Sequence, residues 1–275
     1  MIKLTNMEFE ELISFVKINF GIDLATRKVF VETRLQKLMT ENKYTDFKSY
    51  FEYVCSDFTG VAAANFISGL TVNYTLFYRE SYQFNFFTET VLPELVESEA
   101  EKKDLRIWSA GCSTGEEPYT ISMLINDYFG TDKWNWDTTI LATDISMFAL
   151  QKAVEGIYPI ESIENLNPEW INKYFIFNED QETVSISPKL KNEVIFRKQN
   201  LMSYKFNFKQ KFHAIFCRNV MIYFDEPTRY ALIEKFYDHL CDGGYLFIGV
   251  SETIDRNNSK FKYIMPSIYK KEKNI

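Results

Sequence analysis

Hydrophobic residues recur at helical spacing through the first 70 residues. Thr5-Asn-Met-Glu8 has the pattern of a capping box, and Gly21 ends the apolar run that follows it. The inward positions of this first helix are Phe9, Leu12, Ile13, Val16 and Phe20. A second helix is predicted from about Leu24 to Met39, and two shorter helices near residues 45–56 and 60–70. These segments predict a small all-helical domain at residues 1–70.

From residue 81 onward, short apolar runs alternate with helical patterns. After a helix over residues 82–96, strands are predicted at residues 105–110, 138–144, 193–197, 212–220 and 242–250, with a terminal hairpin at 261–270. This order predicts an α/β domain with a Rossmann-like seven-stranded sheet over residues 81–275. Residues 157–192 interrupt the alternation and predict an insertion with a small antiparallel sheet. Its edge suits the addition of a peptide strand, and a purely structural excursion explains it equally well.

The turn after the first strand indicates a cofactor site. Gly111 and Gly115 permit a tight turn, and a helix opens directly after them with Glu116 and Glu117. Neither a dinucleotide nor a phosphate-binding glycine motif is present. Two carboxylates at a helix N-terminus would repel a phosphate, so they favour a cationic ligand such as S-adenosylmethionine. The alternative is that these glutamates only stabilise the start of the helix.

Polar residues follow several of the predicted parallel strands. Gly111, Asp144, Asn200 and Asn219 each stand at the carboxyl end of a strand, where ligands of open α/β sheets bind. An acid at the end of the second strand commonly holds ribose hydroxyls, although Asp144 could instead be only a helix N-cap. Residues 71–80 form a linker between the domains, and Asn73, Thr75 and Arg79 stand there at near-alternate positions that point to one side. The linker is therefore expected to line the site.

Composition narrows the class of protein. The chain is 46% hydrophobic and 25% charged with a net charge of −7, which argues against general nucleic-acid binding. The four cysteines lie far apart and the two histidines fall inside apolar or helical segments, so neither a metal site nor a catalytic triad is expected. No signal peptide and no apolar stretch of membrane-spanning length is present. We therefore expect a cytoplasmic protein without membrane insertion and, lacking any long coiled coil, a monomer.

The second predicted helix has a basic side. Arg27, Arg34 and Lys37 are spaced so that they share one side of a helix over residues 24–39. This side is either a solvated basic face or a docking site for an acidic partner helix.

Three longer strings, taken in order, carry a resemblance to a known family. They are Asn73-Tyr-Thr-Leu-Phe-Tyr-Arg-Glu80, Ser113-Thr-Gly-Glu-Glu-Pro-Tyr119 and Cys217-Arg-Asn-Val-Met-Ile-Tyr-Phe-Asp225. With the N-terminal helical domain, they make the chain similar over nearly its full length to the chemotaxis receptor methyltransferases. That family esterifies glutamate side chains on bacterial chemoreceptors. The resemblance implies a class I S-adenosylmethionine-dependent methyltransferase fold, with S-adenosylhomocysteine as the product.

The resemblance also implies residue roles. Residues expected to contact or border the cofactor are Asn73, Thr75, Arg79, Glu116, Asp144, Asn200, Leu201, Asn219 and Val220. Arg79 and Tyr223 are expected to face the reacting group. Tyr78 departs from the family motif, which has Phe there, and the loop between Phe175 and Thr183 is glycine-free and shorter than in members that tether to a receptor's C-terminal peptide. These departures argue against tethering and leave the chemistry intact.

The expected reaction needs no general base. A glutamate carboxylate is already ionised at neutral pH, so the rate must come from alignment of the reacting atoms and exclusion of water. Arg79 would orient the carboxylate and Tyr223 would hydrogen-bond to it; alternatively, Arg79 only anchors the cofactor's carboxylate and Tyr223 is a core aromatic. The sequence thus predicts methylation of glutamates on chemoreceptor cytoplasmic helices. Two alternatives are another acceptor and a non-catalytic cofactor-binding module.

Overall fold

The N-terminal part of the chain folds into a helical domain. The computed structural model describes residues 3–71, 74–179, 182–256 and 258–273. The helices before residue 72 are α1 (Asn6–Phe20), α2 (Lys28–Glu41), α3 (Phe47–Ser56) and α4 (Val61–Leu70). The predicted capping box is present, since the Thr5 hydroxyl accepts from the Glu8 N–H while the Glu8 carboxylate accepts from the Thr5 N–H. Gly21 ends α1 in the left-handed conformation, as predicted.

The second helix begins later than the sequence predicts. The segment before α2 forms a turn because the Asp23 carboxylate accepts the Ala25 N–H and the Arg27 N–H donates to the Leu24 carbonyl. Leu24 is buried as predicted but precedes the helix, and Arg27 lies at its N-cap rather than inside it. The prediction of a helix from Leu24, with Arg27 on its face, is therefore wrong at this end.

The larger domain is built on a seven-stranded sheet, as predicted. Its strands in chain order are β1 (Ile107–Ala110), β2 (Ile140–Asp144), β6 (Val194–Lys198), β7 (Phe212–Cys217), β8 (Leu240–Ile248), β9 (Lys262–Met265) and β10 (Ile268–Lys270). The spatial order is β6-β2-β1-β7-β8-β10-β9. The first five strands in this order pair in parallel and the last two close the edge as an antiparallel hairpin.

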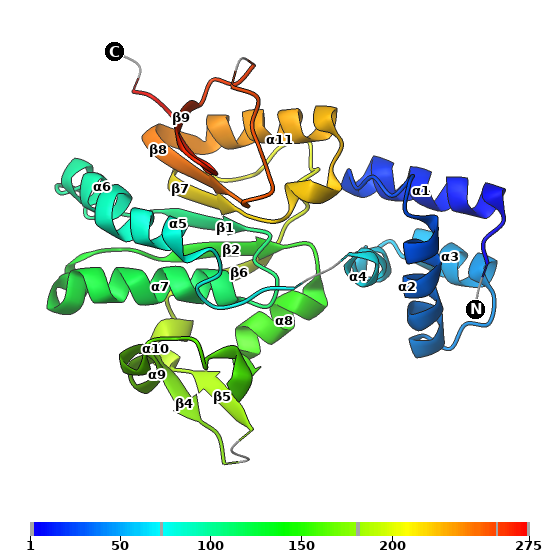
Figure 1. The fold of residues 1–275 in the computed structure, drawn as a ribbon, viewed down its shortest axis with the longest axis horizontal. Coiled ribbons are helices and arrows are strands. Elements are labelled where there is room, and N and C mark those ends of the chain that lie inside the picture. The colour runs from blue at the N-terminus through cyan, green and yellow to red at the C-terminus, as the bar shows by residue number, and fades with distance from the viewer. Residues whose placement is uncertain (1–2, 72–73, 180–181, 257, 274–275) are drawn as a thin grey trace.

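Helices cover both faces of this sheet (Figure 1). The helical elements of this domain outside the insertion are α5 (Ser81–Phe86), the π-helical turn η1 (Phe87–Val91), α6 (Leu92–Ser98), α7 (Glu116–Phe129), the 3-10 helix η2 (Gly130–Asn135), α8 (Met147–Glu155), the 3-10 turn η4 (Met221–Tyr223) and α11 (Glu226–His239). Adjacent residues of β1 show the two faces, because Ile107 packs in the core with α5, α6 and α7 whereas Trp108 packs in the core with α11. Because both faces are covered, Ile107, Trp108 and Ala110 are all buried apolar residues.

The insertion forms its own small sheet, as predicted. Its elements are β3 (Ile157–Pro159), η3 (Ile160–Ser162), α9 (Pro168–Tyr174), β4 (Phe175–Phe177), β5 (Thr183–Ile186) and α10 (Pro188–Lys191). The order is β3-β5-β4, all antiparallel, and β3 is a strand that the sequence pattern did not indicate. The Asp127 carboxylate of α7 accepts from Trp170, Lys173 and Tyr174, each at 2.5 Å, and so ties α9 to the main domain.

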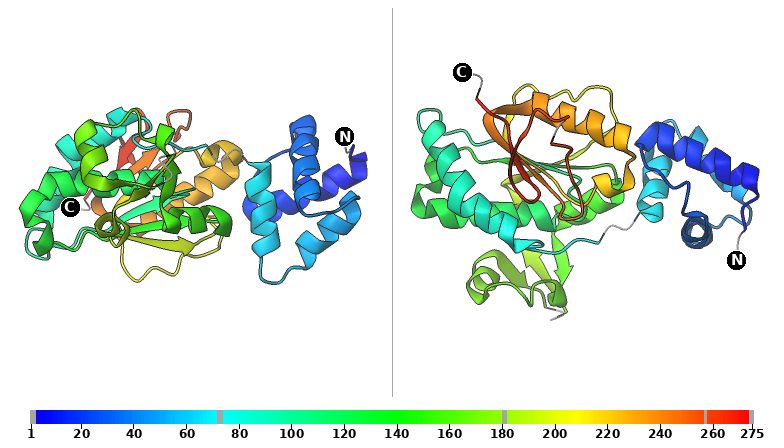
Figure 2. Two further views of the ribbon diagram at one scale, coloured as in Figure 1. Left: turned by 90° about the horizontal axis from the view of Figure 1, so that it is seen from below. Right: turned by 45° about the horizontal axis from the view of Figure 1, so that its top comes forward.

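The helical domain packs at one end of the larger domain, as Figure 2 shows from two directions. Ile22 forms an isolated antiparallel bridge with Phe224, and the Asp23 N–H donates to the Tyr223 carbonyl at 2.8 Å. Lys17 of α1 lies 2.9 Å from the carboxylate of Asp225. Within the described residues, no helix is both long and apolar enough to cross a bilayer.

Asp225 provides a test of the domain contact. Its carboxylate caps α11 through the Thr228 N–H and accepts from Lys17, and these two partners lower its pKa to about 2. Because the folded pKa lies below the unfolded value, this stabilisation is present above about pH 4 and is lost as the pH falls towards 2. Asp225→Ala should lower the free energy of unfolding by about 1 kcal/mol at pH 7, measured by urea denaturation.

Asp225→Asn is the matched variant, because an asparagine keeps the cap and loses the ion pair. Its deficit relative to the wild type should shrink as the pH is lowered from 6 to 3. A deficit that is independent of pH would contradict this account.

Candidate active site

A cavity lies at the carboxyl ends of the central parallel strands, between the two domains. Of the predicted cofactor and catalytic residues, those that line it are Thr75, Arg79, Gly111, Asp144, Asn200, Leu201, Asn219, Val220 and Tyr223. Asn73 lies outside the described residues. The helical domain contributes Phe20, Ile22 and Ile67 to the wall. The structure therefore brings nearly all of the predicted site residues together.

The loop after β1 needs its glycines. Gly111 has φ 88° and Gly115 has φ 99°, both in the left-handed region. A Cβ on Gly111 would lie 2.4 Å from Cγ2 of Val220, which is closer than real atoms approach. Gly111 thus makes room for the side chain of Val220, which follows β7 at the cavity wall.

Asp144 ends β2 and is held by the cofactor loop. Its Oδ2 accepts the Ser113 N–H at 2.9 Å and its Oδ1 accepts the Ser146 N–H at 2.8 Å. Burial raises the pKa of Asp144, and these backbone donors offset part of that effect. The N-cap of α8 is Ser146, whose hydroxyl accepts the Ala149 N–H, so the alternative that Asp144 is only an N-cap is wrong.

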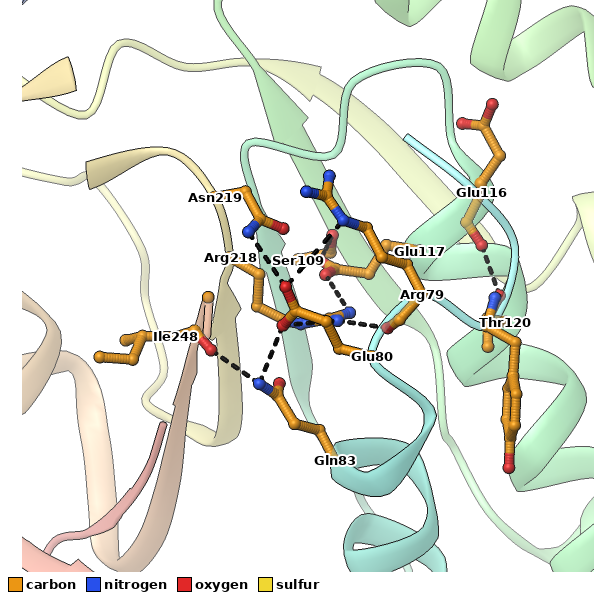
Figure 3. A network of polar contacts seen from close by, with 12 residues as sticks. Arg79, Glu80, Gln83, Ser109, Glu116, Glu117, Thr120, Arg218, Asn219 and Ile248 are labelled. Atoms are coloured by element: carbon orange, nitrogen blue, oxygen red, sulfur yellow. Dashed lines mark hydrogen bonds and ion pairs between the residues drawn. The ribbon is translucent and has the colours of Figure 1, made fainter. Parts of the chain in front are cut away.

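The two glutamates that open α7 point in different directions (Figure 3). Glu117 lines the cavity and accepts from the Ser109 hydroxyl at 2.6 Å. Glu116 is buried, accepts from the Thr114 hydroxyl and is not among the cavity residues. Burial raises the pKa of both carboxyls. The structure thus brings Glu117 to the site rather than Glu116, whose predicted cofactor contact stays a prediction.

Arg218 is a site residue that sequence reasoning did not single out. Its side chain is 3% exposed, and its guanidinium lies 3.1 Å from both Glu80 and Glu117 (Figure 3). It also donates to the carbonyl of Arg79 and lies over the ring of Phe84. Arg218 stands inside a string that carried the family resemblance, and a lone arginine there gave no further signal. Its role depends on partners that are remote in sequence.

Two strained residues are held beside Arg218. Glu80 and Asn219 both have φ 61°, which is uncommon for residues with a side chain. The Asn219 amide donates to Glu80 at 3.1 Å. Buried Glu252, also missed at the sequence level, accepts the N–H groups of Asn219, Ile222 and Gly249. These bonds fix the turn after β7, in which Asn219 adopts the left-handed conformation.

The predicted catalytic pair lies on the cavity wall. Arg79 donates through Nη1 to the Tyr74 carbonyl at 2.8 Å, and its side chain remains 32% exposed. Tyr223 is half-buried, and its ring packs against the core of the helical domain. Both side chains line the cavity, so both can reach a ligand there.

Two of the three basic residues predicted to form a docking face share a surface in the structure. Arg34 and Lys37 line a second groove beside the cavity, whereas exposed Arg27 is not among its residues. The helix start at Lys28 separates Arg27 from the other two.

The residues of the cavity fit S-adenosylmethionine. Asp144 and Glu117 suit its cationic and hydroxyl groups, and Ile22 and Ile67 offer an apolar surface for an adenine. Arg218 supplies a further observation, because its buried Nε has no hydrogen-bond partner among the described residues and a ligand carboxylate is a suitable acceptor. No group of three or more metal-ligating side chains occurs in the part of the chain that was described.

Comparisons with known proteins give matches over nearly the whole chain. Residues 73–269 match the model of the CheR methyltransferase SAM-binding domain, and residues 7–71 match that of the CheR methyltransferase all-alpha domain. The chemotaxis protein methyltransferase of Borreliella burgdorferi is 42% identical over 98% of this chain and 96% of its own length. That of Escherichia coli is 33% identical over 97% of this chain and 91% of its own length.

Arg218 allows a direct test of the site. In Arg218→Lys the charge stays, but one ammonium group cannot bridge Glu80, Glu117 and the Arg79 carbonyl in the same way. We expect unfolding to become easier by about 1–3 kcal/mol and S-adenosylmethionine to bind at least about tenfold more weakly. Denaturant unfolding and calorimetric titration measure the two effects.

Arg197→Lys, on the exposed side of β6, is the matched control and should bind the cofactor normally. Wild-type cofactor affinity in folded Arg218→Lys would show that the bridge does not shape the site.

Proposed function

This chain belongs to the CheR methyltransferase family, and on that premise we propose that it esterifies glutamate side chains on the cytoplasmic helices of chemoreceptors. The enzyme is an S-adenosylmethionine-dependent methyltransferase acting in chemotaxis. The observation that supports the acceptor is a cofactor-type cavity with Arg79 and Tyr223 on its wall. A guanidinium and a phenol are groups that hold a carboxylate.

The cofactor would be held by residues from the linker and the methyltransferase domain. We assign Thr75, Asn200, Leu201, Asn219 and Val220 to the wall around it, together with Asp144 at the end of β2. Asn73 and Glu116 remain candidate contacts on the family resemblance alone. When bound, S-adenosylmethionine supplies a methyl group on a cationic sulfur and leaves as S-adenosylhomocysteine.

The protein's own contribution is to orient the acceptor carboxylate and to exclude water from the reacting atoms. The acceptor carboxylate is ionised at neutral pH, so no side chain has to remove a proton. Arg79 would hold the carboxylate and Tyr223 would donate a hydrogen bond to it, which aligns one oxygen for attack. The apolar wall of Phe20, Ile22 and Ile67 limits water around the reacting atoms.

The partner would be an acidic helix of the receptor. Arg34 and Lys37 face the groove beside the cavity and carry charge of the sign that attracts such a helix. We further propose that the protein acts as a cytoplasmic monomer. We also propose that it does not bind nucleic acid, because a net charge of −7 repels the phosphate backbone.

The assignment is tested by transfer of labelled methyl from S-adenosylmethionine to a chemoreceptor cytoplasmic fragment. We expect label that is released as methanol in base, because a carboxyl methyl ester is base-labile. Label that survives base would indicate another acceptor group. Cofactor binding without transfer to receptors from the protein's own source would favour a different substrate or a non-catalytic module.

The roles of Arg79 and Tyr223 can be separated by kinetics. Tyr223→Phe should lower kcat about fivefold to tenfold, since one hydrogen bond to the carboxylate is lost, while the Kd for S-adenosylmethionine stays the same. Arg79→Lys should lower kcat/KM for the receptor fragment about tenfold or more. A main effect of Arg79→Lys on the cofactor Kd would instead assign Arg79 to the cofactor's carboxylate.

Charge reversal tests the docking face. The double variant Arg34→Glu/Lys37→Glu should raise KM for the receptor fragment about fivefold or more, and the effect should weaken as salt is added. Arg27→Glu makes the same kind of change outside the groove and should leave KM nearly unchanged. If Arg27→Glu raised KM as much as the double variant does, Arg27 would belong to the docking face.

A further inference from the structure

The groove beside the cavity is built from both domains. It is lined by Arg34 and Lys37 of α2, Ser68 of α4, and Phe148 and Lys152 of α8. Thr71 and Ser113 line both this groove and the cofactor cavity, so the two are continuous. A ligand lying in the groove would therefore touch the helical domain, the methyltransferase domain and the entrance to the site.

The groove is cationic on a chain of net charge −7. Among the described residues that line it, Arg34, Lys37 and Lys152 are basic and Glu41 is the one acid. Glu41 lies 3.8 Å from Lys37, with both side chains more than half exposed, so this pair is weak and easily exchanged for a partner's carboxylate. The charge pattern selects an acidic partner.

Small residues line part of the groove. They are Ser68, Gly69 and Ala149. A Cβ on Gly69 would lie 2.3 Å from Cδ2 of Leu38, so α2 and α4 are packed too closely for a larger residue there. The Ser68 and Ser146 hydroxyls, 3.1 Å apart, join α4 to the start of α8. Gly69 thus permits the close packing of α2 on α4, and the groove runs along the contact of these helices with α8.

One wall of the groove carries an apolar and a charged group side by side. Phe148 on α8 is 60% exposed. The ammonium group of Lys152, one turn further along, lies 4.7 Å from the centre of its ring. An amphipathic acidic helix offers the complementary pair, an apolar side chain and a carboxylate one turn apart.

We propose that α8 forms the second wall of the acceptor groove. Phe148 packs against an apolar side chain of the receptor helix that carries the target glutamate, and Lys152 pairs with an acid on the same helix. The acceptor helix is then held between α2 and α8 with its glutamate directed towards Thr71 and Ser113. This assignment rests on the proposed function and adds two specificity residues from the methyltransferase domain.

The test compares Phe148→Ala and Lys152→Gln with the wild type in methyl transfer to a chemoreceptor cytoplasmic fragment. At saturating S-adenosylmethionine, KM for the fragment should rise about fivefold to thirtyfold for Phe148→Ala and about twofold to fivefold for Lys152→Gln. The kcat and the cofactor Kd should stay within about twofold, because neither residue lines the cofactor cavity. The effect of Lys152→Gln should also diminish at high salt.

Matched control positions lie at the amino-terminal ends of the strands, on the side of the sheet away from the cavity. Trp134, which is 82% exposed, precedes β2, and exposed Lys209 precedes β7, so both stand near the amino ends of these strands. Trp134→Ala and Lys209→Gln should leave KM for the fragment unchanged.

The outcomes separate this inference from the proposed function. An unchanged KM in both α8 variants, with normal methylation by the wild type, overturns the α8 wall and leaves the function standing. A cofactor Kd that shifts as much as KM also overturns it, because the two residues would then act through the cofactor site. If the wild type methylates no receptor fragment, the proposed function fails and the acceptor groove fails with it.

Discussion

The cofactor cavity depends on a buried guanidinium with two carboxylate partners. Arg218 lies at the end of β7, Glu80 in the segment that joins the domains, and Glu117 in the first turn of α7. Burying these charges is unfavourable unless each finds hydrogen bonds, and breaking such a group by removing one partner typically costs about 3–5 kcal/mol. Arg218 meets this requirement by joining three segments that are far apart in sequence. The positions of the cavity walls therefore follow from how one charge is satisfied.

The same group explains why strained backbone is tolerated at the site. Glu80 and Asn219 are both held at φ 61°, a left-handed conformation that disfavours Glu80 by about 1 kcal/mol or more and that asparagine adopts more readily. The Asn219 amide is bound to Glu80 and its N–H to Glu252. Once this turn is fixed, Val220 is placed against Gly111, and the absence of a side chain on Gly111 becomes a requirement. Local conformation is thus subordinate to the polar contacts.

The order of elements could be predicted from hydrophobic spacing, because strands and helices of an α/β domain bury long, regular faces. The capping box at Thr5 and the helix end at Gly21 were equally local and were predicted correctly. The start of α2 was predicted too early, because the turn before it depends on the Asp23 carboxylate rather than on the spacing of apolar residues. Arg218 and Glu252 were not identified as site residues because their roles depend on partners that are remote in sequence. Which of two adjacent glutamates faces the cavity is likewise decided by Arg218 and Ser109, and the sequence pattern treats both alike.

The helical domain is part of the active site rather than an appendage to it. Phe20, Ile22 and Ile67 complete the wall of the cofactor cavity, and the carbonyl of Tyr223 is bound by the Asp23 N–H. Any movement between the domains would therefore open the cavity to water and displace a residue proposed to hold the acceptor carboxylate. Methyl transfer to an ionised carboxylate gains its rate from alignment of the reacting atoms and from exclusion of water. The packing between the domains therefore affects the rate of transfer directly. An acceptor helix that touches both α2 and α8 would favour the closed arrangement while it is bound, which couples recognition of the substrate to assembly of the site.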